Sequence, residues 1–543
     1  MRLLLLFITV FLVAACSQHP SAENVVIGRI WTGNPEQPWA DAMAVNGDTI
    51  AAIGSRDDIA PWIGDSTQVI RVPDGQLITP GFIDSHTHFV EGGFRLSSVQ
   101  LRDALTKEEF VKRIADYAKT VPAGTWIMGG DWDNQNWGGE LPEKTWIDDV
   151  TPNHPVWINR LDGHMSLANS AALKAAGISD QVKDVPGGAI ERKKGKPTGI
   201  FKDNAMTLID RAVPPASPEQ EDRALDAAMN YVAARGVTSA HNMSGYWSAF
   251  ERARAQNRMI TRIYAGASID RWRELDAKIK KEGRGDAWLR FGNLKQFVDG
   301  SLGSHTAAFF KPFADAPNDS GFFLTPPDEL YRGIKSADSA GLHLMVHAIG
   351  DKGIRTLLDI FERVQKENGP RDRRFRVEHL QHIHPADIPR LKELGVIASM
   401  QPVHCPATVD VGDVWPQRPG TERWRDSFAW QSLRAAGARQ AFGSDWPVAP
   451  MDPFLGFWYG LARQPWQEGD PVQRLRLEEL IDGYTRDAAY AEFQEHEKGM
   501  VRPGMLADLA LLNADLFATP EGEIAQVKPV LTMVDGRAVF REI

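Results

Sequence analysis

Eight short apolar segments along the middle of the chain constrain its fold more than any other feature. Each is typical of a β-strand, and each lies next to a segment with helical periodicity. Eight strands that alternate with helices predict an α/β fold, the parallel (β/α)8 or TIM barrel. A doubly wound open sheet would normally have a glycine-rich phosphate turn after its first strand, and this sequence has none. The segments are residues 81–86, 236–242, 261–268, 292–300, 343–351, 375–381, 395–402 and 439–446.

The helical segments have recognisable boundaries. Ser217 and Gln220 have the spacing of a capping box at the start of one helix, and Gly236 is expected to end that helix. Thr106 and Glu109 have the same spacing and predict a second capping box.

The two ends of the chain differ from its middle. Short β-type segments separated by turns, including a hairpin signal at Asn46-Gly47-Asp48, precede the barrel, and a similar pattern returns near the C-terminus. We therefore expect residues 16–80 and 497–543 to form one small β-sandwich domain, and residues 81–496 to form the barrel. Extra residues at about 90–216 are expected to form an insertion after the first barrel strand, above the mouth where barrel active sites lie.

The insertion is rich in tryptophan. Most of these rings are expected to fill its own core, but we expect one or two to line a substrate pocket, with Trp132 as the candidate. Five of the 17 tryptophans lie in this region: Trp126, Trp132, Trp137, Trp146 and Trp157.

The N-terminus has the pattern of an export signal. Arg2 is followed by the apolar stretch LLLLFITVFLVAA, which is too short for a membrane span and ends at Cys16. The stretch LVAAC resembles the lipobox of bacterial lipoproteins. Residues 1–15 are therefore expected to be a signal peptide, and Cys16 to be the lipidated first residue of the mature protein. Ser17 after this cysteine favours the outer membrane, facing the periplasm.

Charge and cysteine content narrow the range of partners. The formal net charge of −10, without any Lys/Arg-rich run, argues against nucleic acid. No later stretch is apolar and long enough to span a bilayer, so the lipid anchor is the only expected membrane contact. Cys405 would have no partner for an internal disulfide once Cys16 is lipidated, and is expected to be structural. The sequence leaves a homo-oligomer open.

The first strand segment ends in His86-x-His88. Alternate residues of a strand face the same side, so both imidazoles are expected to point into the barrel mouth. His347 and His379 lie in the fifth and sixth segments, and Asp445 ends the eighth. Four converging imidazoles repel one another when charged, and a bound divalent cation removes this cost. The pattern predicts a metal site in which Asp445 is a ligand and also accepts a proton from bound water.

Lys295, in the fourth segment, does not suit a cation site as an ammonium group. Either its side chain points away, or its amine has reacted with CO2 to give a carbamate that can bridge two metals. Nitrogen and oxygen ligands without thiolate fit one or two zinc ions, and also manganese, iron or cobalt.

In order along the chain, these residues resemble the signature of the amidohydrolase superfamily. The stretches GGDWDNQ, DGHMSLANSAAL, LKQFVDGSLGSHTA, VEHLQ and GSDWPV are similar to its family 3 branch, which includes N-substituted formamide deformylase-like enzymes. The resemblance covers about residues 24–543. It implies hydrolysis of an amide or related C–N bond, commonly with zinc, and a small terminal domain, but it names no substrate. The implied ligands are His86, His88, Lys295, His347, His379 and Asp445.

Other polar residues are candidates for substrate contact. His164 matches a motif of the family and is expected to donate a hydrogen bond to the substrate carbonyl. His241, His305 and His404 lie near strand ends, where each could contact substrate or hydrogen-bond to a ligand. His382 is expected in an exposed loop.

Three functions are compatible with these patterns. The first is hydrolysis of an N-acyl, N-formyl or cyclic amide. The second is hydrolysis of an ester, carbamate or phosphoester at the same site, because an activated water is not selective. The third is a surface lipoprotein with a non-catalytic metal site, which the presence of Asp445 disfavours because binding alone does not require a proton acceptor.

Overall fold

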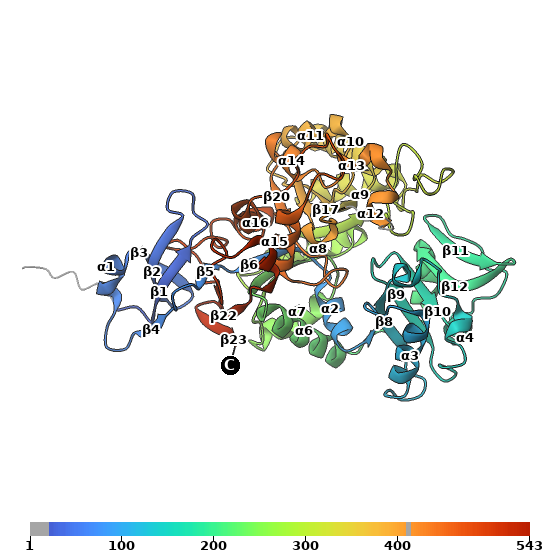
Figure 1. Ribbon diagram of the computed structural model, residues 1–543, viewed down its shortest axis with the longest axis horizontal. Helices are drawn as coiled ribbons and strands as arrows, with labels where there is room; N and C mark the ends of the chain where they lie inside the picture. The colour runs from blue at the N-terminus through green and yellow to red at the C-terminus, as the bar shows by residue number, and fades with distance from the viewer. Residues whose placement is uncertain (1–20, 409–413, 543) are drawn as a thin grey trace, which may run out of the picture.

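The computed structural model describes residues 21–408 and 414–542, so the expected signal peptide and Cys16 lie outside the described residues. A sheet built from both ends of the chain occupies one end of the long axis (Figure 1). Parallel strands with their helices form the middle, and the insertion occupies the other end (Figure 1). None of the helices in these two ranges is long and apolar enough to cross a membrane.

Each of the eight predicted strand segments contains a β-strand, and these strands run parallel to their neighbours. They form two sheets. The first has the order β15-β14-β13-β6, with bounds Leu289–Phe291, Arg262–Ala265, Val237–Asn242 and Phe82–Thr87. The second has the order β16-β17-β18-β19-β20, with bounds Asn293–Phe297, His343–Ala348, Arg376–His379, Ile397–Met400 and Gln440–Phe442.

The two parallel sheets meet at two seams. At one seam β15 and β16 follow each other along the chain but belong to different sheets, and an isolated bridge pairs Ser268 with Lys295. At the other seam an isolated bridge pairs Thr87 with Trp446. The expected strands are therefore present, and the two sheets meet only through these isolated bridges, so a continuous ladder around a closed barrel is not detected among the described residues.

Both ends of the chain contribute to one connected sheet, in which the predicted hairpin at Gly47 joins β2 and β3. Neighbouring residues of β1 pack into different apolar clusters: Val25 packs with Ala44, and Val26 packs with Leu509 from the C-terminal segment. Each face of β1 thus contributes to a core. The strands are β1 (Asn24–Trp31), β2 (Trp39–Asn46), β3 (Thr49–Gly54), β4 (Gln68–Arg71), β5 (Leu77–Pro80), β21 (Leu509–Leu512), β22 (Pro529–Val534) and β23 (Arg537–Arg541).

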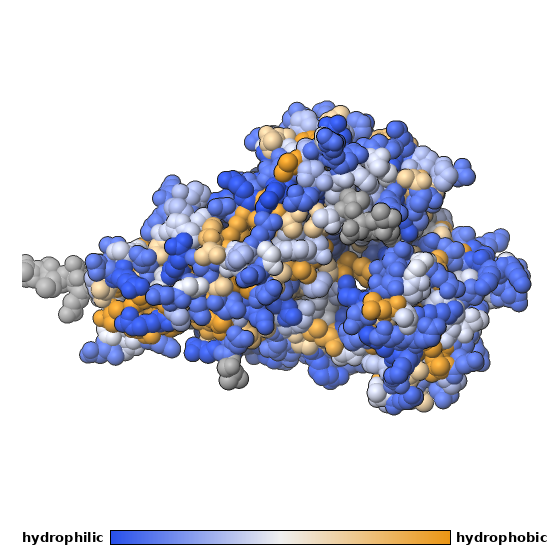
Figure 2. Space-filling model, in the orientation of Figure 1, coloured by the Kyte–Doolittle hydropathy of each residue, from blue (hydrophilic) through white to orange (hydrophobic). Residues whose placement is uncertain are grey.

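The insertion forms its own six-stranded sheet with the order β11-β12-β10-β9-β8-β7. Phe110 of helix α3 (Lys107–Ala118) packs with Trp132 in an apolar cluster that belongs to this region. The face of the insertion that Figure 2 shows is largely hydrophilic, with smaller hydrophobic patches. Its strands are β7 (Val99–Gln100), β8 (Ile127–Trp132), β9 (Val156–Arg160), β10 (Met165–Ala168), β11 (Gly188–Lys193) and β12 (Lys196–Asp203).

The structure confirms the capping box of helix α6 (Pro218–Ala233): Ser217 and Gln220 each accept a backbone hydrogen bond from the other. At α3, Thr106 caps the helix as expected, but the Glu109 carboxylate accepts from Leu105 instead of completing the box. Further helices of the central body are α2 (Phe89–Leu96), α7 (Trp247–Ala255), α8 (Trp272–Glu282), α9 (Pro327–Ser339), α10 (Asp351–Asn368), α11 (Ile388–Glu393), α14 (Trp430–Ala435), α15 (Pro453–Ala462), α16 (Leu477–Gly483) and α17 (Arg486–Ala491).

Arg262 of β14 ties the central body to the terminal sheet. Its buried guanidinium lies 2.7 and 2.9 Å from the two carboxylate oxygens of Asp508 and 3.1 Å from Asp535. Arg262→Ala is expected to lower the free energy of unfolding by about 3–5 kcal/mol, because it leaves buried carboxylates without their cation. Urea unfolding followed by circular dichroism measures this loss.

Arg254→Ala is the matched control, since the ion pair of Arg254 with Asp286 is exposed on both sides and should contribute less than about 1 kcal/mol. A loss below about 1 kcal/mol for Arg262→Ala would contradict this role.

Candidate metal centre

The expected ligands meet at the C-terminal ends of the parallel strands. A parallel sheet places these ends at one edge, so side chains from distant parts of the sequence converge there. β6 carries His86 and is followed directly by His88; β16 carries Lys295, β17 carries His347, β18 ends at His379, and Asp445 follows β20.

Asp445 lies at the middle of this group. Its Oδ1 atom is 3.3 Å from Nε2 of His86 and 3.4 Å from Nε2 of His88. The possible ligand atoms of these three residues lie within 4.8 Å of one another, so one ion can contact all three. Nζ of Lys295 lies 3.1 Å from Nε2 of His86.

His347 and His379 complete the cluster. The ring centroid of His379 lies 4.4 Å from that of His347 and 4.8 Å from that of His86. The structure therefore brings all six residues of the expected ligand set into one region.

The hydrogen bonds of His86 prepare it to bind a cation. Its Nδ1 atom lies 2.6 Å from a carboxylate oxygen of Glu378, which can only accept, so Nδ1 carries the proton and Nε2 carries a lone pair. That lone pair faces Oδ1 of Asp445, a buried atom that makes no hydrogen bond with any described residue. Two electron-rich atoms buried side by side fit a cation between them.

In two further imidazoles a hydrogen bond also fixes the proton on one ring nitrogen. Nδ1 of His379 donates to Oε1 of Gln401 at 2.8 Å, and Nε2 of His347 donates to the carbonyl of Gly300 at 3.0 Å. Each ring thus keeps its other nitrogen unprotonated, as a metal ligand requires.

Burial keeps these imidazoles neutral. It lowers the pKa of His86 to about 4, with the charge of Lys295 acting in the same direction. Burial also lowers the pKa values of His347 and His379 well below the usual range of histidine. All three rings are therefore in the state that binds a metal at neutral pH.

Asp445 is held as a carboxylate. Burial acts to raise its pKa, but the histidine cluster around it, which includes His88 at 3.4 Å, outweighs this effect and holds the pKa well below the usual range. Its backbone has a φ of 60°, which is uncommon outside glycine, and its N–H donates to the carbonyl of His86 at 2.8 Å. This bond crosses the seam between the two sheets and positions the carboxylate beside His86.

Lys295 lies at the other seam, where its backbone N–H donates to the carbonyl of Ala267 at 2.7 Å. Burial lowers the pKa of its amine to about 8. Its Nζ also lies over the ring of Phe297, 4.8 Å from the centroid. The side chain points into the cluster, so the alternative in which it turns away from the centre does not hold.

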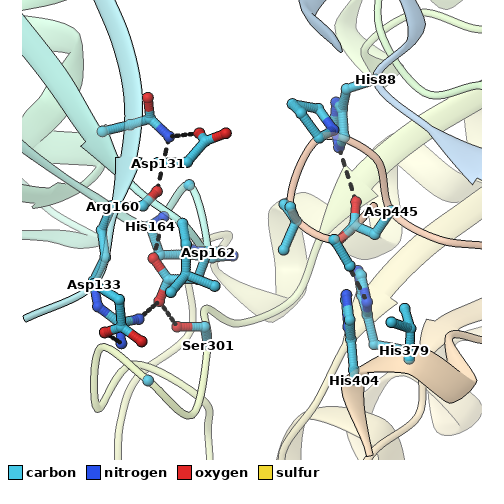
Figure 3. Close-up of a pocket in the computed structure, with 18 of the residues that line it drawn as sticks. His88, Asp131, Asp133, Arg160, Asp162, His164, Ser301, His379, His404 and Asp445 are labelled. Carbon is cyan, nitrogen blue, oxygen red and sulfur yellow. Dashed lines mark hydrogen bonds and ion pairs between the residues drawn. The ribbon is translucent and has the colours of Figure 1, made fainter. Parts of the chain in front are cut away.

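The cluster opens into a cavity of about 860 Å3 whose opposite wall comes from the insertion. Figure 3 shows the two walls facing each other, with Asp131, Asp133, Arg160 and Asp162 opposite Asp445. Arg160 is paired with both Asp133 and Asp162 at 2.8 Å. Asp131 is paired with Arg95 and Arg102, so this wall offers hydrogen-bonding groups whose charges are largely balanced.

His164, expected to contact substrate, does line the cavity. Its Nδ1 lies 2.6 Å from a carboxylate oxygen of Asp203, and its ring centroid lies 5.3 Å from that of His347. Burial acts to lower the pKa of His164, but the bond to Asp203 outweighs it and the pKa is raised.

Two expected substrate contacts do not reach the cavity. Trp132 is completely buried in the core of the insertion, and its indole donates to the carbonyl of Ile158. His305 is turned toward Asp315, 3.0 Å from its carboxylate, and does not line the cavity.

The expectation that one or two tryptophans of the insertion line the substrate pocket is also wrong. All five pack into two apolar clusters of that region, and none lines the cavity. Trp415, from a different part of the chain, does line it.

His382 is buried and not exposed as expected; it is 2% exposed and bonded to Ser427 at 2.8 Å. His241 is also fully buried and does not line the cavity; its ring lies 2.8 Å from a guanidinium nitrogen of Arg376, which is not one of the expected ligands. His404 lines the cavity beside His379.

Sequence reasoning missed the residues that orient the ligands. Glu378 binds His86, Gln401 binds His379, and Ser244 lies 3.0 Å from Nδ1 of His88. Glu378 immediately precedes His379 and Gln401 follows β19, so proximity to a strand end was an available signal. Their partners are set by tertiary contacts between distant strands.

The sequence is similar to those of known proteins over most of its length. A model of the amidohydrolase family matches residues 74–540. The protein LONG AFTER FAR-RED 3 of Arabidopsis thaliana is 38% identical over 535 residues, which cover 95% of this chain and 91% of that protein. The N-substituted formamide deformylase of Arthrobacter pascens is 26% identical over 543 residues, which cover 94% of this chain and 97% of that enzyme.

A solved structure shares the fold. An uncharacterised metal-dependent hydrolase from Pyrococcus horikoshii superposes with a TM-score of 0.73 at 24% identity, covering 92% of this chain and 99% of that one. The family model spans most of the chain, and the expected His, Lys and Asp side chains converge at one edge of the parallel strands. This chain belongs to the amidohydrolase family.

Proposed function

We propose that this protein is a metal-dependent hydrolase that cleaves an amide or related C–N bond in a small molecule. The observation that carries the proposal is the place of Asp445, an ionised carboxylate that faces His86 and His88 in the wall of the 860 Å3 cavity. The proposed substrates are N-acyl, N-formyl or cyclic amides. Similarity to the N-substituted formamide deformylase of Arthrobacter pascens supports this class.

The donor atoms of the cluster fit one or two zinc ions, with manganese, iron or cobalt as alternatives. When bound, such a cation lowers the pKa of a coordinated water from about 15.7 towards about 7 and polarises a substrate carbonyl. The residues that would hold it are His86, His88, Lys295, His347, His379 and Asp445.

Lys295 is proposed to act as a carbamate. Its pKa of about 8 leaves more of the amine uncharged at neutral pH than in an exposed lysine. The uncharged nitrogen can form a bond to the carbon of CO2 and release a proton, which gives an anionic oxygen ligand. This change removes the repulsion between an ammonium group and the proposed cation.

Asp445 is proposed to accept the proton of the attacking water and to deliver it to the leaving amine. His164 is proposed to donate a hydrogen bond to the substrate carbonyl from the nitrogen that does not bind Asp203. The raised pKa of His164 favours the protonated ring, in which both nitrogens are donors.

The substrate class is tested by a screen of the zinc-loaded protein against N-acyl amino acids, formamides and cyclic amides. Esters and carbamates belong in the same screen, because an activated water also attacks these carbonyl groups. Turnover of esters alone would contradict amide hydrolysis and support the alternative function, ester hydrolysis at the same site. The absence of turnover on every class, with metal bound, would favour a non-catalytic metal-binding lipoprotein.

Asp445→Asn is expected to lower kcat by about 10²–10⁴-fold, because the amide cannot accept the proton of water. The assay uses saturating zinc, and the metal content of the same samples is measured so that metal loss is not mistaken for loss of proton transfer. Asp359→Asn is the control, since the Asp359 side chain on α10 is 61% exposed and does not line the cavity. Hydrolysis at the wild-type rate in Asp445→Asn would rule out this mechanism.

Export and lipid anchoring are proposed for the N-terminus, with the protein on the outer membrane facing the periplasm. Cys16→Ser in the full chain is expected to abolish labelling by radioactive palmitate and to move the protein out of the membrane fraction. Cys405→Ser should keep the label, because this thiol is buried in the body of the protein. Label retained in Cys16→Ser, or absent from the wild type, would exclude a lipid anchor at Cys16.

A further inference from the structure

His404 lies at the metal centre although it is outside the ligand set that the family resemblance implies. It ends the short helix η7 (Pro402–His404), which follows strand β19. Its side chain lines the same cavity as His379 and Asp445. The segment that follows β19, the seventh of the predicted strand segments, was not expected to supply a ligand but thus also contributes a metal-binding type of side chain to the centre.

The free nitrogen of His404 points to a missing partner. Its ring interacts with the backbone of Ser444, and its Nε2 atom is buried without a hydrogen-bond partner among the described residues. A buried nitrogen of this kind normally has a partner, because leaving it unsatisfied costs roughly 1–3 kcal/mol. A ligand at Nε2 would remove this cost.

The neighbours of His404 are suitable co-ligands. His379, His404 and Asp445 each offer a ligand atom, and these atoms lie within 4.8 Å of one another. The rings of His379 and His404 are almost parallel, with centroids 6.2 Å apart and an interplanar angle of 6°. Figure 3 shows the two rings side by side, with Asp445 above them.

Asp445 belongs to two groups of possible ligands. One group is His86, His88 and Asp445, and the other is His379, His404 and Asp445. A carboxylate has two oxygen atoms and can contact a cation on each side. Because Asp445 belongs to both groups, the two cation positions lie next to each other. This arrangement is known from two-metal hydrolytic sites.

We propose that His404 is a metal ligand, and that His379, His404 and Asp445 form a second cation position beside the one at His86, His88 and Asp445. This inference rests on the proposed metal-dependent function and extends it to a residue outside the expected set. Two nitrogen donors and one oxygen donor suit zinc or cobalt. The loop after β19 then helps to decide how many metals the centre holds.

The test is a metal titration of the full-length, metal-free protein. Co²⁺ is added in steps and followed by calorimetry and by its visible absorption, and Zn²⁺ is titrated in parallel. The wild type is expected to bind two equivalents. His404→Ala is expected to lose the second equivalent, or to bind it at least about 10-fold more weakly, while the first stays within about 2-fold; even the loss of an outer partner of a ligand weakens metal binding by about 10–100-fold.

Three further variants make the result decisive. His404→Gln keeps a polar side chain of similar length and replaces His404→Ala if circular dichroism shows that the alanine variant is unfolded. His86→Ala should weaken the first position and so identifies its absorption bands. His496→Ala is the matched control, because this side chain is 84% exposed and should leave both equivalents unchanged.

The possible outcomes separate this inference from the proposed function. Two equivalents with unchanged affinities in both His404 variants would overturn the role of His404 and leave the hydrolase proposal intact. A single equivalent in the wild type would overturn the second position. No bound metal in the wild type would overturn the proposed function together with this inference.

Discussion

The orientation of His86 depends on a buried ion pair between Arg376 and Glu378. Both side chains are completely buried, with a guanidinium nitrogen 2.7 Å from a carboxylate oxygen. A buried carboxylate costs several kcal/mol unless a cation and hydrogen bonds compensate it, and Arg376 provides the cation. Glu378 can then remain ionised and accept the Nδ1 proton of His86. Arg376 also donates a hydrogen bond to Ser399 at 2.7 Å, and this second contact links β18 to β19.

This ion pair is part of a polar interior beneath the metal centre. Arg376 contacts His241 of β13, whose other ring nitrogen lies 3.2 Å from Glu492. Glu492 is paired with Lys498 at 2.7 Å, and both are buried. The chain of contacts therefore runs from a proposed ligand to the segment that leads into the C-terminal strands. Above the centre, ion-paired residues of the insertion line the opposite wall of the cavity, and this wall has its own sheet and apolar core.

Much of the site could be predicted from local sequence, because strand alternation alone places His86 and His88 on one side. The helix caps and strand segments were also readable, since they depend on residues a few positions apart. The seams between the two sheets could not be predicted from the sequence, because they depend on pairing between strands distant along the chain. Trp132 was misplaced because an aromatic side chain has the same sequence signal in a core as in a pocket. Glu378 was missed, and His404 was expected only as a substrate contact or a hydrogen-bond partner of a ligand, because only tertiary contacts bring these side chains to the centre.

The central claim is that Asp445 and the histidines around it hold a metal ion. Anomalous X-ray diffraction at the zinc absorption edge, from crystals of the zinc-loaded protein, tests it most directly. The predicted result is an anomalous peak in contact with Nε2 of His86, Nε2 of His88 and the carboxylate of Asp445. A zinc-loaded crystal with no anomalous peak among these residues, or with peaks only elsewhere on the protein, would contradict the account.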